Sequence, residues 1–406
     1  MFKKIMKSYD YSLIIVYALL CLFGVVMVYS ASMVVSVTKY ELPSDYFYQR
    51  QLLYVLVGFV AFCLAAVFPY KAFKFNKVLV PILILTVGSL FAVQLIGANA
   101  SANNAQSWIS LGGGFKIQPS EFAKLSIIIY LSVVYAKKQA YINDFNKGVA
   151  PPIAILIFIC TLVIIQPDLG TATIIFAIGC SVILCSGVNI KTLFKLIGLA
   201  VVFAVLFSPM IWLKKDDILT EEKLGRIDAY FDPFLDPLDN GLQLINSYFA
   251  IGNGGIQGVG LGESIQKLGY LPEPHTDFIM AIISEELGLL GVSFVILGIG
   301  YIVLKGIYIG MKSKDPFATM LAVGISSMIG IQTFINLGGV SGLIPITGVP
   351  LPFISFGGSS LIVLSLSMGL LVNVSMFAKY EEKYKEDKSQ KNSSSKIRQN
   401  GYSINA

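Results

Sequence analysis

The sequence predicts an all-α protein that crosses a membrane about ten times, with the N and C termini in the cytoplasm. Hydrophobic residues make up 55% of the 406 residues and charged residues only 13%, whereas soluble domains usually carry roughly 25% charge. The mean hydropathy is +0.74. The apolar residues form runs close to the roughly 20 residues that a helix needs to cross the hydrocarbon core.

Ten of these runs are predicted to be membrane spans. They cover residues 11–34, 51–68, 78–97, 120–136, 150–166, 169–187, 190–213, 278–304, 316–338 and 351–378. Lysines set the expected orientation, because every segment on the inner side contains them, from Lys3 to Lys305 and beyond. Residues 1–378 are therefore predicted to be one membrane domain. Residues 379–406 lack the apolar residues of a core and are predicted to be a disordered cytoplasmic tail.

The segments expected outside are 35–50, 98–119, 167–168, 214–277 and 339–350. The fourth, between the seventh and eighth spans, is far longer than the 2–8 residues usual between helices. That length favours a functional loop over a cap that only shields the fold. Residues 242–251 have apolar residues at helical spacing and predict a short interfacial helix. Residues 252–262 are rich in glycine, which suits either an anion-binding nest or a flexible loop.

Two of the three arginines, Arg50 and Arg226, fall on the outer side, where the positive-inside rule disfavours them. A guanidinium can bind phosphate through two parallel hydrogen bonds. Both residues therefore predict phosphate binding, with anchoring to lipid headgroups as the alternative.

Charged residues also occur within the predicted spans. Glu121 and Lys124 are three residues apart and share one face of the fourth span. They form either a structural ion pair or part of a polar site. In the eighth span, Glu285 and Glu286 need partners or a polar cavity.

The only histidine, His275, lies in the sequence Pro274-His275-Thr276-Asp277, where the long loop meets the eighth span. Thr276 is a predicted N-cap and Asp277 the first helical residue, so Asp277 could simply complement the helix dipole. The functional alternative is a carboxylate at the mouth of an outward-facing cavity, with Glu285 about 12 Å deeper along the helix. Carboxylates and arginines there suit a substrate that carries a diphosphate.

All five cysteines lie within predicted spans, and there is one histidine. The sequence therefore predicts neither a disulfide framework nor a Cys/His metal cluster. No nucleic-acid partner is expected.

Several motifs, in this order, resemble those of the SEDS family of cell-wall polymerases, FtsW and RodA, over about residues 9–378. They are Gly24–Ser32, Tyr48–Gln51, Gln118–Glu121, Gln166–Thr171, the loop from Asp232 to Gly262, Leu271–Phe278, Glu285–Gly288 and Pro345–Ser360. The Asp-Tyr-Ser sequence at residues 10–12 and Met27–Ser32 are more similar to the division branch, FtsW. One departure is Ser107, because the family often has an arginine there.

The resemblance implies a peptidoglycan glycosyltransferase in the bacterial cytoplasmic membrane, at the division septum. It would polymerise lipid II on the outer leaflet and release undecaprenyl diphosphate. A class B penicillin-binding protein, which is a transpeptidase, and other divisome membrane proteins are the implied partners. By position, Asp277 matches the family's essential carboxylate, while Arg50, Glu121 and Lys124 match residues that line its cavity. The other expected substrate contacts are Asp168, Arg226, Gln243, His275, Ser355 and Ser359.

The expected reaction leaves three roles open for Asp277. It could be the base that helps the acceptor hydroxyl attack, it could orient that hydroxyl, or it could bind a divalent cation such as magnesium or manganese on the diphosphate. No other cofactor is expected. Two other functions also stay open. A lipid II flippase would need charge along the whole crossing path, and a non-catalytic divisome scaffold would not need Asp277.

Overall fold

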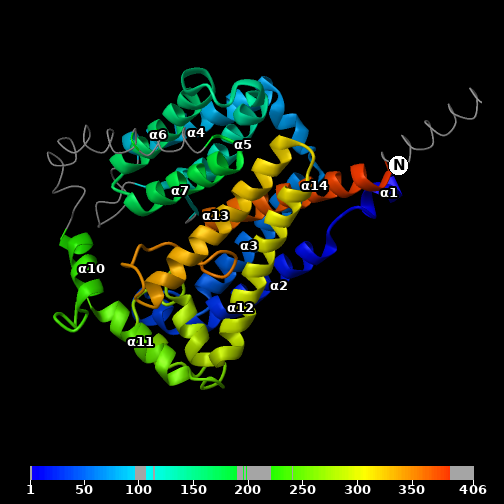
Figure 1. Ribbon diagram of the computed structural model, residues 1–406. Helices are drawn as coiled ribbons and strands as arrows, with labels where there is room; N and C mark the ends of the chain where they lie inside the picture. The colour runs from blue at the N-terminus through cyan, green and yellow to red at the C-terminus, as the bar shows by residue number, and fades with distance from the viewer. Residues whose placement is uncertain are drawn as a thin grey trace, which may run out of the picture.

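The computed structural model describes residues 2–96, 107–112, 115–189, 195, 198, 221–239 and 241–384. This part of the chain is helical apart from one short antiparallel hairpin (Figure 1). Its elements are α1 (Phe2–Met6), α2 (Tyr11–Thr38), α3 (Tyr46–Val67), η1 (Tyr70–Lys74), α4 (Asn76–Ile96), β1 (Ile109–Gly112), β2 (Phe115–Ile117), α5 (Pro119–Lys137), η3 (Gln139–Tyr141), η4 (Phe145–Val149), α6 (Ala150–Ile165), α7 (Leu169–Cys185), α10 (Glu221–Phe231), α11 (Leu242–Gly254), η5 (Gln266–Leu268), α12 (Ile279–Lys312), α13 (Pro316–Val340) and α14 (Gly358–Tyr384).

The all-α membrane fold is confirmed. Eight helices of the described residues are long and apolar enough to cross a membrane, and α7 is a shorter apolar helix of 17 residues. These nine helices match nine predicted spans, including the short fourth one. The predicted span at 190–213 lies outside the described residues, apart from 195 and 198. Proline and aspartate start several helices as expected: Pro119 opens α5, and Asp168 accepts a hydrogen bond from the Thr171 amide at the start of α7.

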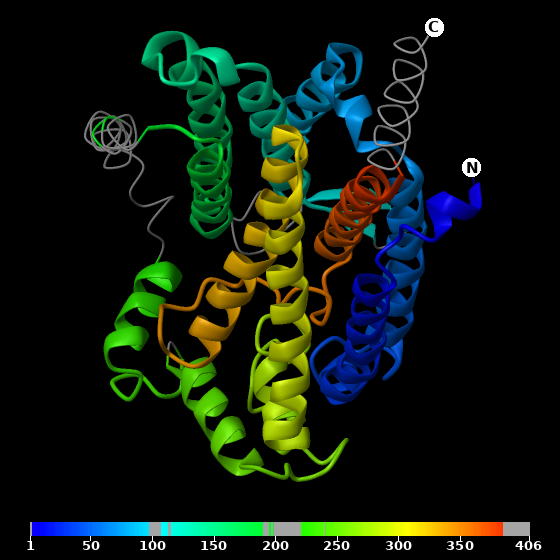
Figure 2. The same cartoon turned by 45° about the vertical axis from the view of Figure 1, so that its right-hand side comes forward.

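Helices α13 and α14 lie at the centre of the described bundle (Figure 1). α13 packs against α12, α5 and α7, whereas α14 packs along α3. Figure 2 shows α6 and α7 on one side of this core and α2 and α3 on the other. Glycines let α3 and α14 approach closely: a Cβ atom at Gly369 would clash with the Phe62 carbonyl, and one at Gly58 would lie 2.7 Å from Ser365 Oγ. Small residues of this kind are typical where helices pack in lipid.

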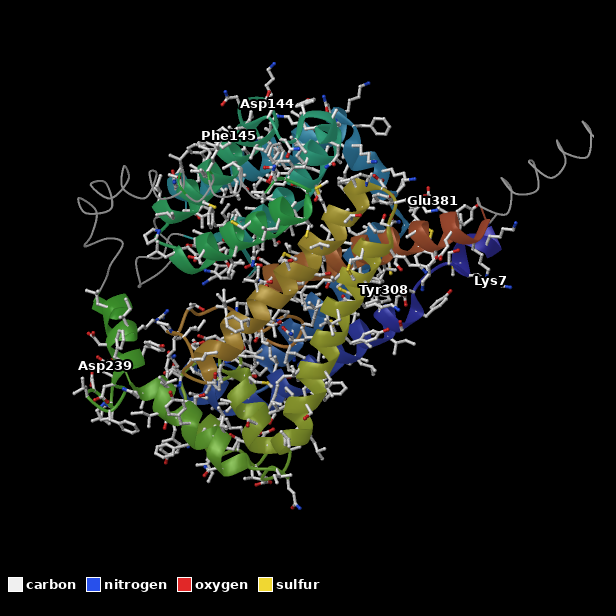
Figure 3. All side chains as sticks on the ribbon, in the orientation of Figure 1. Lys7, Asp144, Phe145, Asp239, Tyr308 and Glu381 are labelled. Carbon is white, nitrogen blue, oxygen red and sulfur yellow. The ribbon has the colours of Figure 1, made fainter. Side chains whose placement is uncertain are left out.

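One ion pair joins the two ends of the described chain, and a second ties the end of α14 to η1. Lys379 Nζ lies 2.7 Å from an oxygen of Asp10, and Lys71 Nζ lies 2.8 Å from Glu381. Figure 3 shows Glu381 at this end of the molecule and Asp239, in the long loop, at the opposite end. The first and last described segments thus lie together, as the predicted pair of cytoplasmic termini requires.

The tenth span differs from the prediction at both ends. Residues 351–357 are not helical, because Pro350 and Pro352 have no N–H to give a helix and the Leu351 amide donates instead to Ser355 Oγ at 2.8 Å. α14 begins at Gly358 and continues to Tyr384, so the first residues of the predicted tail are helical. Residues 385–406 lie outside the described part.

The described part of the long outer loop contains two α-helices and the short 3-10 helix η5. α11 confirms the predicted helix at 242–251, and α10, which the sequence analysis missed, carries Arg226. The hairpin of β1 and β2 lies in the segment 98–119, where only a loop was predicted.

Helix α12 consists of two arms that fold back on each other. Gly288 has the non-helical torsions φ 58° and ψ −151°, and it separates a first arm, residues 279–287, from a second arm, residues 289–312. A Cβ atom at Gly291 would lie 3.1 Å from a methyl group of Ile283, whereas residues eight apart in a straight helix are about 12 Å apart along the axis. Figure 1 shows the two arms meeting at the outer end of the molecule.

The reversal overturns the predicted position of Glu285. The outer loop caps the turn, because the amides of Val259 and Gly260 donate to the carbonyl oxygens of Glu285 and Glu286 at 2.9 and 3.0 Å. The first arm therefore runs from Asp277 outward. Glu285 lies toward the outer loop and not deeper than Asp277.

Candidate active site

Asp277 lies in the last turn of the loop before α12. Its carbonyl oxygen accepts a hydrogen bond of 2.7 Å from Asn336 Nδ2 of α13, and the same amide donates to the Val349 carbonyl at 2.8 Å. The predicted helix start was wrong by two residues. The helix begins at Ile279, and the Thr276 hydroxyl contacts the Glu273 carbonyl and Asp277 Oδ1 at 3.0 and 2.9 Å instead of capping the helix.

Arg226 and Asp277 meet over Gly348. A Cβ atom at Gly348 would lie 3.8 Å from Arg226 Nη1 and 4.0 Å from Asp277 Oδ2. Gly348 has a φ of +70°, which glycine adopts without the steric cost that a side chain brings. Three segments that are far apart in the sequence thus place a carboxylate, a guanidinium and an open stretch of backbone together.

The surroundings of Asp277 favour its neutral form. Part of its surface is accessible, yet protein surrounds it on most sides, and this removal from water raises the pKa of Asp277 above its usual range. The Thr276 hydroxyl and the charge of Arg226 oppose the increase. A carboxylate with a raised pKa is a stronger base than an ordinary aspartate.

Asp168 belongs to the same region. A Cβ atom at Gly170 would lie 3.4 Å from the Thr347 carbonyl, next to Gly348, and 4.0 Å from Asp168 Oδ1. Asp168 Oδ2 accepts a hydrogen bond of 3.1 Å from Gln118 Nε2. The start of α7 therefore lies against the loop of Gly348, over which Arg226 and Asp277 meet.

Ser355 and Ser359 hold backbone. Ser355 Oγ accepts from the Leu351 amide at 2.8 Å, and Ser359 Oγ accepts from the Gln118 amide at 3.0 Å and donates to the Lys116 carbonyl at 3.2 Å. These bonds shape the loop before α14 and join it to the hairpin. The roles of both serines toward a substrate stay predictions.

Arg50 lies at the outer end of α3. Its Cζ atom is 5.2 Å from the centroid of the Tyr46 ring, and its side chain interacts with Tyr54. The Tyr54 ring in turn lies 5.9 Å from that of Phe356. Arg50 therefore flanks the loop before α14.

His275 is buried at 2% exposure among aromatic rings. Its ring centroid lies 4.2 Å from that of Phe47 and 5.6 Å from that of Phe356, and its carbonyl accepts from the Phe356 amide at 2.9 Å. Burial lowers the pKa of His275 to about 4, although the charge of Glu273 opposes the decrease. His275 is therefore neutral at physiological pH and packs the loop against α3.

Glu121 and Lys124 form a buried ion pair of 2.7 Å. Gln332 of α13 belongs to the same level of the bundle. The chain just before α5 bonds to Ser359 on the outer side, whereas Asp315, just before α13, pairs with Lys74 on the inner side, so the two helices run in opposite directions. A Cβ atom at Gly324 would lie 2.7 Å from Ile128. Sequence reasoning missed Gln332, although a lone glutamine in an apolar helix is a signal. Within the described residues, both of its side-chain polar atoms and Glu121 Oε2 are buried without a hydrogen-bond partner, so this level of the bundle can accept polar groups of a ligand or water.

Gln243 lies half-buried in the first turn of α11. In the described part of the chain, no three His, Cys, Asp or Glu side chains come close enough to hold a metal ion. Asp277 feels the charges of both Arg226 and Glu273, and the role of a divalent cation at this carboxylate stays a prediction.

An apolar cavity of about 650 Å³ lies between α3, α4, α5 and α14. It extends from Phe68 near the inner end of α3 to Ile109 and Ile117, which pair with each other in the hairpin. Pro119 and Phe122 of α5 also line it, within one turn of Glu121. The hairpin therefore borders the apolar cavity, while Lys116 and Gln118 at its end bond to Ser359 and Asp168.

The fold and the site define a class: a polytopic membrane protein with a carboxylate and an arginine brought together at its outer loop and an apolar cavity between its helices. The chain belongs to the cell cycle protein family of FtsW, RodA and SpoVE, whose model matches residues 10–380.

Relatives cover nearly the whole chain. It is 56% identical over 386 residues to a probable peptidoglycan glycosyltransferase FtsW of Bacillus subtilis, which covers 95% of each protein. It is 39% identical to stage V sporulation protein E of the same organism, over 92% of this chain and 98% of that protein.

Solved structures share the fold. A chain of a peptidoglycan synthase complex, studied for the structural coordination of polymerization and crosslinking, matches with a TM-score of 0.69 and 23% identity over 91% of this chain and 98% of that one. The rod shape determining protein RodA of Thermus thermophilus matches with a TM-score of 0.62 and 22% identity over 90% and 96%.

Proposed function

We propose that this protein is a peptidoglycan glycosyltransferase that polymerises lipid II at the outer face of the cytoplasmic membrane and releases undecaprenyl diphosphate. The observation that carries this proposal is the meeting of Asp277 and Arg226 over Gly348. The names of the relatives at 56% identity and below support the same activity.

The geometry suits an inverting sugar transfer. The donor sugar is α-linked to diphosphate and the product is β-1,4-linked, so one displacement suffices. Asp277 accepts the proton of the attacking 4-hydroxyl as that oxygen bonds to the anomeric carbon. The bond from the anomeric carbon to the diphosphate breaks, and Arg226 stabilises the negative charge that develops on the leaving group.

The apolar cavity suits the polyprenyl chain. Its lining is almost entirely apolar and it reaches the hairpin next to the polar residues. A lipid-linked sugar needs such an arrangement, because its tail stays in an apolar phase while the diphosphate reaches charged groups.

The direct test supplies labelled lipid II to purified protein together with its transpeptidase partner and separates the products by length on a gel. We expect a ladder of glycan strands. A lipid II flippase would instead move labelled lipid across sealed vesicles without extending it, and a scaffold would do neither.

A first prediction concerns Arg50, which we propose as a second phosphate contact. Arg50→Ala is expected to reduce polymerisation more than Arg50→Lys, since lysine keeps the charge but loses the paired hydrogen bonds. Rates with labelled lipid II at several substrate concentrations measure the effect. Wild-type rates for Arg50→Ala would exclude this contact.

The partner we propose is a class B penicillin-binding protein, and the docking surface is an apolar tip of the outer loop. The tip consists of Phe231, Phe234, Leu235 and Leu238, which are 66–84% exposed. Asp232 and Asp239 lie beside them and are exposed. Carboxylates disfavour contact with an anionic lipid surface, so the tip fits a protein with a basic rim. With such a partner and other divisome proteins, the enzyme would act at the septum.

A second prediction tests this tip. The double variant Phe234→Ser with Leu235→Ser is expected to weaken co-purification with the transpeptidase at least about 10-fold, because buried aromatic and aliphatic anchors dominate interface energies. Leu261→Ser, at another exposed apolar position of the same loop, is the matched control and should bind normally. Equal binding by all three proteins would contradict the proposed surface.

A further inference from the structure

A buried ion pair connects the loop that carries Asp277 to the first arm of α12. Lys267 Nζ lies 2.8 Å from Glu286 Oε1 and 3.0 Å from Ser30 Oγ. Ser30 Oγ also lies 2.7 and 2.8 Å from the two Glu286 oxygens. Lys267 is 2% exposed and Glu286 is 1% exposed. These three residues, here named the clasp, join the outer loop, the first arm of α12 and α2.

Glu285 extends the clasp to the loop backbone. Its carboxylate accepts hydrogen bonds from the Ser264 hydroxyl and from the amides of Ile265 and Gln266, the latter two at 3.3 Å. The Lys267 amide donates to Ser264 Oγ at 3.3 Å. Lys267 and the two glutamates of the first arm are therefore each held by several hydrogen bonds that are removed from water.

The clasp closes a ring with Asp277 near its midpoint. One branch runs from Lys267 along the loop to Asp277, and the other runs back through the first arm to Glu286. Asn336 of α13 holds the Asp277 carbonyl from one side. With the ring closed at its outer end, the carboxylate has little freedom to move relative to Arg226 and Gly348.

A buried lysine is an energetically costly residue with which to connect the outer loop to the first arm. Removing either partner leaves an unpaired charge away from water, which is strongly unfavourable. Well-packed apolar residues often stabilise as well as a buried pair does. A role that uses the fixed geometry of the pair therefore explains Lys267 better than stability alone.

We propose that the clasp is a positioning device for Asp277, which it ties to α2 and to the outer loop. Lys267, Glu286 and Ser30 bond to one another at the outer end of the first arm and act through the placement of the carboxylate. The inference rests on the proposed glycosyltransferase activity. Because the clasp connects α2 and the loop of residues 256–268 to the arm that follows Asp277, contacts on the outer surface of these segments can change turnover.

The test compares Lys267→Met and Ser30→Ala with Lys74→Met. Lys74 pairs with Asp315 at 2.9 Å on the inner side, so its variant loses an ion pair far from Asp277. Each protein is purified with the transpeptidase partner and normalised to its folded fraction by size exclusion. Rates with labelled lipid II then give kcat and KM over a range of pH.

We expect Lys267→Met to lower kcat at least about 10-fold with little change in KM, and to move the acidic limb of the pH profile, because the distance from Asp277 to Arg226 changes. Ser30→Ala keeps the ion pair and should lower kcat several-fold. Lys74→Met should keep the kcat and pH profile of the wild type.

Wild-type kcat and pH profile in Lys267→Met and Ser30→Ala would overturn the clasp, and Ser30→Ala decides if Lys267→Met does not fold. If Lys74→Met loses as much kcat as Lys267→Met, the clasp contributes to stability like other ion pairs and does not position Asp277. Failure of the wild type to polymerise lipid II in the same assay would instead overturn the proposed function.

Discussion

Asp277→Asn is expected to abolish glycan polymerisation, with a loss in kcat of at least about 100-fold, the usual contribution of a positioned base. Asparagine has nearly the same shape and can keep the contact with Thr276, so the loop and its bond from Asn336 should persist. The variant should therefore insert, fold and bind the transpeptidase normally. Gel separation of products from labelled lipid II measures the loss.

The matched control is Glu41→Gln, which removes a carboxylate from an exposed position of the first outer segment. It should polymerise like the wild type. Long glycan strands from Asp277→Asn would show that Asp277 is not the base.

The pH dependence follows from the same carboxylate. A base works when it is deprotonated, so activity is present above the pKa of Asp277 and is lost as the pH falls through it. Because burial raises this pKa, the loss begins at a higher pH than for an ordinary aspartate near 3.9. His275, with a pKa of about 4, adds no limb near the usual histidine value of about 6.5.

The apolar runs predicted nine of the spans, because each of these runs is close to the roughly 20 residues that a membrane requires. They did not reveal the reversal of α12, since residues 279–312 read as one apolar stretch. The reversal depends on Gly288 and Gly258, whose backbones approach so closely that a Cβ atom on either would clash. The contact between Gly258 and Gly288 joins residues far apart in the sequence, and a single glycine in an apolar run does not predict it.

The candidate site residues were named one by one from the sequence, and their roles stay predictions; their arrangement in space was not predicted. Asp277 stood out by its polarity beside a span, and Arg226 by its charge on the disfavoured side. Their meeting over Gly348 depends on α10 and on the loop after α13, neither of which has a local signal for that position. The predicted cap at Thr276 failed because its hydroxyl bonds to the Glu273 carbonyl.

Arg226→Ala is expected to lower kcat about 100-fold or more, comparable to the loss of one oxyanion-stabilising donor. Arg226→Lys should retain part of the activity, because the charge remains while the paired hydrogen bonds to phosphate are lost. The two outcomes together separate charge from geometry.

The alanine variant also makes a prediction about Asp277. The positive charge of Arg226 lowers the pKa of that carboxyl, so its removal should raise the pKa further. The acidic limb of the residual activity should therefore move to higher pH in Arg226→Ala and less in Arg226→Lys. An unchanged limb together with wild-type turnover would mean that the guanidinium neither faces Asp277 nor stabilises the leaving diphosphate. If the acidic limb moves while turnover stays normal, Arg226 faces Asp277 but does not stabilise the leaving diphosphate. This pair of variants therefore tests the electrostatics of the site as well as its chemistry.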